Sequence, residues 1–136
     1  MPPAAAPMAP RIPVSVGELI DKVTILRLKL AHIVADEQRA NVARELAVLD
    51  EEARRLDLGD AVAEDERELF AVNETLWNVE EELRAHEARA DFGARFVELA
   101  RTVYRANDER ARIKAKINAA SGSLYREEKS YDGSSR

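Results

Sequence analysis

The sequence contains no cysteine, and its five prolines all lie at or before Pro13. Disulfides, thiolate metal sites and cysteine nucleophiles are therefore excluded. Because proline breaks helix interiors, the chain after Pro13 is free to form long helices. No apolar run reaches the length of a membrane span, and the opening "MPPAAAPMAPRIP" lacks the pattern of a signal peptide. We therefore expect a cytoplasmic protein without membrane insertion, and its 136 residues are enough for one domain.

Charge is distributed unevenly along the chain, whose net charge is −5. Residues 36–91 hold seven bases against eighteen acids, whereas residues 92–118 hold seven bases against three acids. This alternation favours helices that attract one another within one fold. A nucleic-acid-binding domain is typically basic with a continuous basic face, so we do not expect nucleic acid as a partner.

Apolar residues recur at alternating steps of three and four, a heptad rhythm typical of bundled or coiled-coil helices. Ser15 and Glu18 form a capping box that predicts the start of the first helix, and glycines mark later boundaries. The other predicted helices are 39–57, 60–89 and 92–121. The predicted fold is all-α, an antiparallel four-helix bundle-like arrangement of two helical hairpins, the second longer, with an ordered C-terminal tail. Its expected parts are a disordered Pro/Ala-rich head (1–13), a single helical domain (14–131) and a disordered end (132–136).

Long polar side chains interrupt the apolar rhythm of the last helix, and a rise of about 1.5 Å per residue allows their heights to be compared with other helices. The predicted structural polar layers pair Asn73 with Asn107, Trp77 with Tyr104, Glu80 with Arg101, and Lys114 with Asp21 and Lys22. Buried polar groups need partners, so such layers would fix how the helices align. The alternative interpretation is a cleft that holds an anionic ligand. Its candidate binding residues are Lys22, Asn107, Arg110, Lys114 and Asn118.

The last two predicted helices are about 45 Å long and the first two about 30 Å, so the second hairpin should overhang the first. Leu83, Phe92, Phe96 and Leu99 fall in this overhang. Because exposed apolar surface usually finds a partner, we expect a homodimer through the overhang.

Motifs that carry chemistry are missing from the sequence. There is no glycine-rich phosphate loop, nucleophile elbow or zinc motif, and His32 and His86 lack acids at metal-ligand spacing. We therefore expect no catalytic residue, metal or cofactor, and an enzyme is the less favoured class.

Four segments, taken in order, resemble a family of small bacterial helical proteins known as domain of unknown function 6165. They are "VSVGELIDKVTILRLKL" (14–30), "VNETLWNVEEELR" (72–84), "FVELARTVYRANDERARIKAKIN" (96–118) and "EEKSY" (127–131). The resemblance implies no reaction, substrate or cofactor. It implies an accessory role in the assembly of cell-surface polysaccharide, because relatives occur near genes for that process.

The resemblance also draws attention to Glu128, Lys129 and Tyr131 in the tail. When the residues are placed by their rise along the helices, the tail begins at the end of the bundle that holds Asp21, Lys22 and Lys114. We expect "EEKSY" to pack across that end, with Glu128 facing Lys22 or Lys114.

Two functional hypotheses follow. The first is a non-enzymatic, dimeric helical module for interaction or accessory roles. The second is a small all-α enzyme or binding protein that holds an anionic metabolite, such as a sugar nucleotide or dicarboxylate, in the basic layer between helices.

Overall fold

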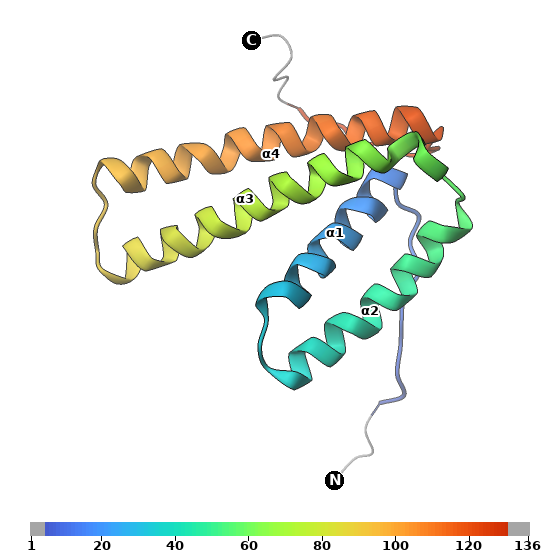
Figure 1. Ribbon diagram of the computed structural model, residues 1–136, viewed down its shortest axis with the longest axis horizontal. Coiled ribbons are helices and arrows are strands. Elements are labelled where there is room, and N and C mark those ends of the chain that lie inside the picture. Colours follow the sequence, from blue (N-terminus) through green and yellow to red (C-terminus); the bar gives the residue numbers. More distant parts are fainter. Residues whose placement is uncertain (1–4, 131–136) are drawn as a thin grey trace.

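The computed structural model describes residues 5–130 of the chain, all in helices, turns and irregular segments. Its elements are α1 (Val16–His32), α2 (Asp36–Arg55), the short 3-10 helix η1 (Gly59–Val62), α3 (Ala63–Ala88) and α4 (Ala94–Ser121). No strand occurs within the described residues, and the four helices pack against one another. The all-α prediction is thus confirmed (Figure 1).

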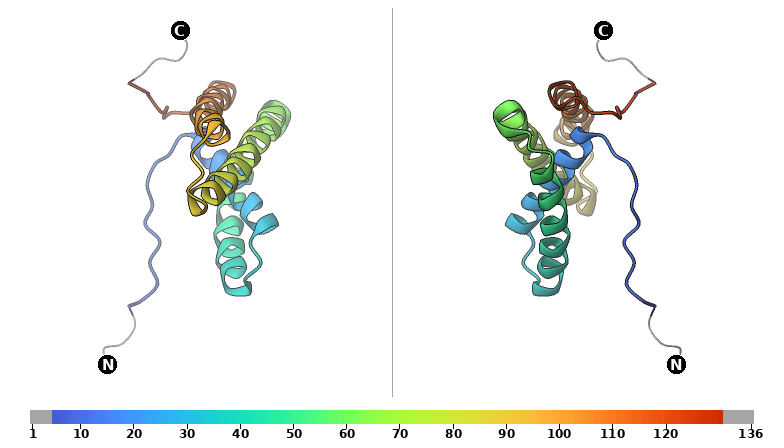
Figure 2. Two further views of the ribbon diagram at one scale, coloured as in Figure 1. Left: turned by 90° about the vertical axis from the view of Figure 1, so that its left-hand side faces the viewer. Right: turned by 90° about the vertical axis from the view of Figure 1, so that its right-hand side faces the viewer.

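The helices form two antiparallel hairpins, α1–α2 and α3–α4, which converge at one end (Figure 1). Helix α1 packs against both α3 and α4, whereas α2 packs on the far side of α1. The α1–α2 hairpin leans away from the α3–α4 hairpin, so the axes of the two hairpins are not parallel (Figures 1 and 2). Helix α1 therefore links the two hairpins, and its contacts with α3 and α4 decide their relative orientation.

Local signals set the helix ends much as the sequence predicts. The Ser15 hydroxyl accepts a hydrogen bond from the backbone N–H of Glu18 at 3.0 Å and caps α1. The other half of the predicted capping box is absent, because the Glu18 carboxylate binds Lys114 instead. Helix α4 ends at Ser121 and is capped by Gly122, which adopts the left-handed conformation (φ 67°) that glycine takes without a steric penalty.

The main apolar core lies where the two hairpins converge. It joins the first turns of α1, the η1 segment, the start of α3 and the last turns of α4, and each of its five residues is at most 3 % exposed: Ile20, Val62, Leu69, Ile113 and Ile117. Helix α2 contributes no buried residue, in keeping with its place on the outer side of α1. The core thus stabilises the end of the molecule that also carries the polar network described below.

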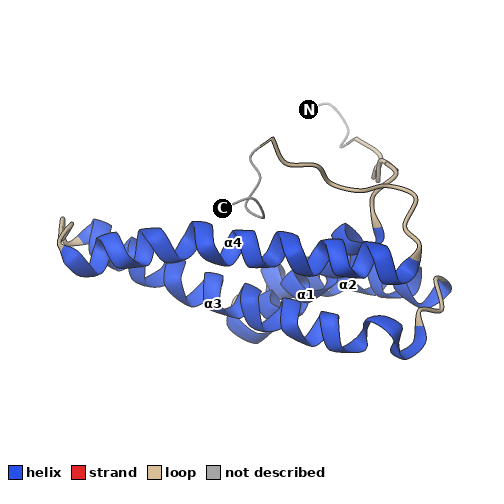
Figure 3. Ribbon diagram, turned by 90° about the horizontal axis from the view of Figure 1, so that it is seen from above, coloured by secondary structure: helices blue, strands red, loops and turns tan. Residues whose placement is uncertain are grey.

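The second hairpin extends well beyond the first, as predicted. Helices α3 and α4 contain 26 and 28 residues, against 17 and 20 in α1 and α2. We call the projecting part, residues 74–105, the arm. Seen from above, α3 and α4 run side by side along the long axis, and the turn that joins them lies at one end (Figure 3). In the arm, Leu99 is buried, while Phe92 and Val97 are 53 % and 51 % exposed.

Residues 5–14 precede α1 as an irregular, exposed segment that stands clear of the helices (Figure 2). Within the described chain, no helix combines the length and the apolar character that a membrane crossing needs.

Candidate functional site

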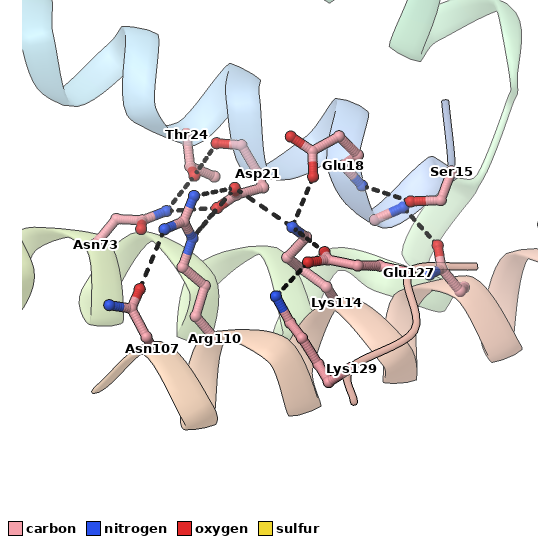
Figure 4. A network of polar contacts seen from close by, with 12 residues as sticks. Ser15, Glu18, Asp21, Thr24, Asn73, Asn107, Arg110, Lys114, Glu127 and Lys129 are labelled. Atoms are coloured by element: carbon pink, nitrogen blue, oxygen red, sulfur yellow. Dashed lines mark hydrogen bonds and ion pairs between the residues drawn. The ribbon is translucent and has the colours of Figure 1, made fainter. Parts of the chain in front are cut away.

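Helices α1 and α4 face each other with opposite charges at matching spacing. Glu18 and Asp21 lie three residues apart on α1, and Arg110 and Lys114 lie four residues apart on α4. Residues three or four apart share one face of a helix, so each pair points in one direction. Because the helices are antiparallel here, Glu18 meets Lys114 and Asp21 meets Arg110 (Figure 4).

Asp21 is the centre of this polar network, although its side chain is only 1 % exposed. The Arg110 guanidinium donates to its carboxylate from Nη2 at 2.5 Å and from Nε at 3.0 Å. Asn73 of α3 donates from Nδ2 to the same carboxylate at 2.9 Å and to the Thr24 hydroxyl at 3.0 Å. These bonds compensate for burial of the charge, and the hydrogen bond to Asp21 raises the pKa of Arg110.

Lys114 is buried between two carboxylates that come from opposite ends of the chain. Its Nζ donates to Glu18 Oε2 at 2.6 Å and to Glu127 Oε2 at 2.9 Å, while Asp21 lies at 3.9 Å. Burial acts to lower the pKa of Lys114, but the hydrogen bonds to Glu18 and Glu127 outweigh it and the pKa is raised. Hydrogen bonds from Lys129 and Lys114 lower the pKa of Glu127 to about 2. Both partners are therefore charged at neutral pH.

Next to this pair, α1 and α4 approach closely enough to require a glycine. The Gly17 N–H donates to the Asn118 Oδ1 at 2.7 Å, and a Cβ on Gly17 would lie 2.6 Å from the backbone oxygen of Lys114. One residue earlier, the N–H of Val16 donates to the hydroxyl of Ser123 at 3.0 Å. These backbone contacts tie the start of α1 to the end of α4 and to the tail.

A groove of roughly 620 Å³ runs along α4 beside the network. Its walls come from α1, α4 and the tail and comprise Glu18, Tyr104, Asn107, Asp108, Arg110, Ala111, Lys114, Glu127 and Lys129. Three acids and three bases line it, so its formal charges balance. Among the residues described, no group of three or more His, Asp or Glu side chains is placed to hold a metal ion.

Most of the predicted site residues lie together at this network, but several of them contact other residues than those predicted. Asn73 and Asn107 were expected to form an amide layer, which is wrong: Asn73 binds Asp21, and Asn107 sits at the exposed edge. There its Oδ1 accepts a long hydrogen bond, 3.4 Å, from Arg110 Nη1. Asn118 is buried at the α1–α4 contact, where its side-chain oxygen accepts a hydrogen bond from the backbone N–H of Gly17.

The predicted layer of Lys114 with Asp21 and Lys22 forms only in part: Lys114 Nζ lies 3.9 Å from the Asp21 carboxylate, but Lys22 is absent from it. Lys22 lies on the outer face of α1 and pairs with Glu45 of α2 at 3.2 Å, so it takes no part in the groove. Trp77 stacks on His32 with ring centroids 4.8 Å apart rather than on Tyr104. The position of a residue along the helix axis does not specify which way its side chain points. Successive side chains are rotated by about 100° around the axis, so two residues at the same height can face away from each other.

The predicted pairing of Glu80 with Arg101 is likewise wrong, since no ion pair joins these two exposed residues in the described structure. A hydrogen bond from Arg101 instead lowers the pKa of the Tyr104 phenol. The residue that crosses between α3 and α4 nearby is Arg95, whose Nε donates to Glu82 Oε2 at 2.6 Å.

The tail does pack on the network, although with a neighbouring residue. Glu127 binds Lys114, whereas Glu128 makes no hydrogen bond or ion pair with the described residues; the predicted contact is therefore displaced by one position. In an extended segment successive side chains point to opposite sides, so a shift of one residue reverses their direction. Lys129 pairs with Glu127, and Tyr131 lies outside the described residues.

Glu18, Thr24 and Glu127 are members of the network that the sequence interpretation did not include. Glu18 was assigned to the cap alone. The signal that could have found it is the match between two acids on one helix and two bases on an antiparallel one.

Comparisons with known proteins give a family but no activity. No curated protein matches the chain, and no solved structure matches it. The family model described as "Family of unknown function (DUF6165)" matches residues 10–135, a range that includes the whole polar network. Because that match covers nearly the entire chain, the protein belongs to this family of unknown function, as the resemblance of its segments predicted.

Proposed function

We propose that the protein is a non-enzymatic interaction module that forms a homodimer through its arm. The observation that carries the proposal is an incompletely covered apolar seam between α3 and α4. Five apolar side chains of the arm are only half-buried: Leu76, Val79, Leu83, Phe96 and Val103. Two helices alone cannot enclose such a seam, and a second arm packed against it would complete a four-helix bundle.

The charges of the arm favour a second copy as the partner. Its α3 portion, residues 74–88, has five acids and one base, and its α4 portion, residues 94–105, has three bases and one acid. A two-fold axis between two arms can set α3 of each copy against α4 of the other, so that unlike charges meet twice.

The polar network is consistent with a structural role in this module. Each of the two cations that α4 supplies has a carboxylate partner: Asp21 for Arg110, and Glu18 and Glu127 for Lys114. Removing one partner from such a pair is costly, so the network holds α1 against α4 and keeps the arm projecting.

The dimer can be tested by sedimentation and light scattering from about 1 to 100 μM, a range that brackets micromolar affinities. Val97→Glu places a charge on the arm, where Val97 is 51 % exposed. Val48→Glu is the matched control on α2, where Val48 is 65 % exposed. We expect a dimer for the wild type and for Val48→Glu, and a monomer for Val97→Glu. A wild-type monomer throughout this range would rule out the arm interface.

An accessory role in the assembly of cell-surface polysaccharide, exercised from the cytoplasm, is the finer part of the proposal, and it rests on the family resemblance. Deletion of the gene should alter the amount or length of surface polysaccharide, and complementation with Val97→Glu should fail where Val48→Glu succeeds. Unchanged polysaccharide in the deletion strain would remove this role.

A further inference from the structure

The groove beside Lys114 already holds a carboxylate, and that carboxylate belongs to the tail. Lys114 is buried and binds two glutamates that lie on different parts of the chain. The two side chains are similarly exposed, at 44 % for Glu18 and 41 % for Glu127, but the backbone of Glu18 is fixed in α1, whereas Glu127 lies on the irregular segment after Gly122. Figure 4 shows the tail crossing the open side of the network to bring Glu127 to Lys114. Glu127 is therefore the partner of Lys114 that can leave without unwinding a helix.

Beyond Glu127, the groove continues along α4 with further polar groups. Arg110 directs Nε and Nη2 to Asp21, but its Nη1 makes only the long 3.4 Å contact with the Asn107 amide among the described residues. Tyr104 lies one turn further on, and Ala111 forms part of the groove wall. Small-molecule sites typically occupy about 300–1,000 Å³, a range that includes this groove of roughly 620 Å³.

We propose that the groove is a carboxylate-binding site in which a ligand carboxylate replaces Glu127 on Lys114 and releases the tail. A second acceptor of the same ligand would reach Arg110 Nη1 and the Asn107 amide. The exchange substitutes one carboxylate for another, so the buried ammonium keeps a carboxylate partner. A neutral or cationic ligand would leave Lys114 with Glu18 and the more distant Asp21. The groove meets the arm only at Tyr104, and the ligand contacts proposed here, Lys114, Arg110 and Asn107, lie outside the arm.

The tethered Glu127 should mask the site in the wild type. A group held on a short flexible segment has an effective concentration of about millimolar or more, which a weak ligand must exceed. Removing the charge of Glu127 removes that competitor. The proposal thus predicts that a substitution in the tail strengthens ligand binding, an effect that a purely structural ion pair would not produce.

The test is calorimetric titration of the full chain with two probes that present the same chemistry. Succinate represents a free dicarboxylate, and the blocked peptide SLYREEKS, which copies residues 123–130, represents a carboxylate on a protein segment. We expect Glu127→Gln to bind at least one probe about tenfold more tightly than the wild type, and Glu128→Gln, the exposed neighbour, to match the wild type. The probe that binds identifies the source. Equal affinity of Glu127→Gln and wild type, or no binding of either probe to Glu127→Gln, overturns the proposal.

Release of the tail has its own readout. Trypsin cleaves after Arg126, immediately before Glu127. In the wild type, the probe that binds should accelerate this cleavage; the peptide is supplied for this assay with glutamine in place of its arginine and lysine, so that trypsin does not cleave it. Binding without faster cleavage would show that the probe sits elsewhere and that no exchange occurs. Adding Lys114→Met to Glu127→Gln should abolish binding of the probe, and retained affinity would count equally against the site.

Discussion

The carboxylate of Asp21 can be neutralised with almost no change of shape by the substitution Asp21→Asn. The side chain is 1 % exposed and receives hydrogen bonds from Arg110 and Asn73. An amide in its place would still accept one of these bonds. However, its NH2 group would face donors of Arg110 or Asn73, and the Arg110 guanidinium would lose its counter-charge.

The expected loss of stability follows from the burial of both partners. Removing one member of a buried ion pair costs about 3–5 kcal/mol. The Arg110 side chain is 27 % exposed and can recover some hydration, which places Asp21→Asn near the lower limit, at about 3 kcal/mol. For a domain of this size, about 1 kcal/mol corresponds to about 4 °C in Tm, so the melting temperature should fall by about 10 °C.

Thermal and urea unfolding followed by circular dichroism would measure both quantities. Glu45→Gln is the matched control, because Glu45 pairs with Lys22 at 3.2 Å on the surface and both side chains are about half exposed. Such a surface ion pair contributes about 0–1 kcal/mol to the free energy of unfolding, so Glu45→Gln should change stability little. If Asp21→Asn proved as mild as Glu45→Gln, the network would not be what holds α1 against α4.

Three further outcomes are expected. Gly17→Ala should lower the free energy of unfolding, measured in urea, by about 1–3 kcal/mol, because the added Cβ would lie 2.6 Å from the Lys114 backbone oxygen. This clash should outweigh the better helix propensity of alanine, and an unchanged urea midpoint would refute the close contact. The Glu127 pKa is lowered to about 2, so its ion pair should be fully present above pH 4.5 and lost as the pH falls through about 2; carboxyl NMR should show this, and a midpoint near 4.5 would contradict it. Truncation after Gly122 removes the tail contacts with Val16 and Lys114 and should lower Tm in calorimetry, whereas an unchanged Tm would argue against docking of the tail.

The helices could be predicted from the sequence because their signals are local. The Ser15 cap, the glycine at position 122 and the apolar rhythm each act within a few residues, and the helix ends follow them closely. The greater length of the second hairpin follows from the same boundaries, so the arm was predictable too.

The partners within the site depended on geometry that the sequence does not contain. Asn73 and Asn107 were placed at equal heights, but the direction of each side chain around its helix and the lean of the first hairpin decide what it meets. The identity of the tail carboxylate depended on the path of an irregular segment, where Glu127 and Glu128 have similar sequence surroundings. Charge matching between α1 and α4 was the one long-range signal available.

The hydrogen bond from Val16 to Ser123 joins positions 107 residues apart, so the helical domain begins and finishes at the same place. The tip of the arm lies at the opposite end of the long axis (Figure 1). A fluorophore attached at Ser15 or Ser123, where the helical domain begins and finishes, would therefore lie far from that tip. A circularly permuted chain, with a short linker across the old termini and new ends opened in the α1–α2 turn, should also be able to fold.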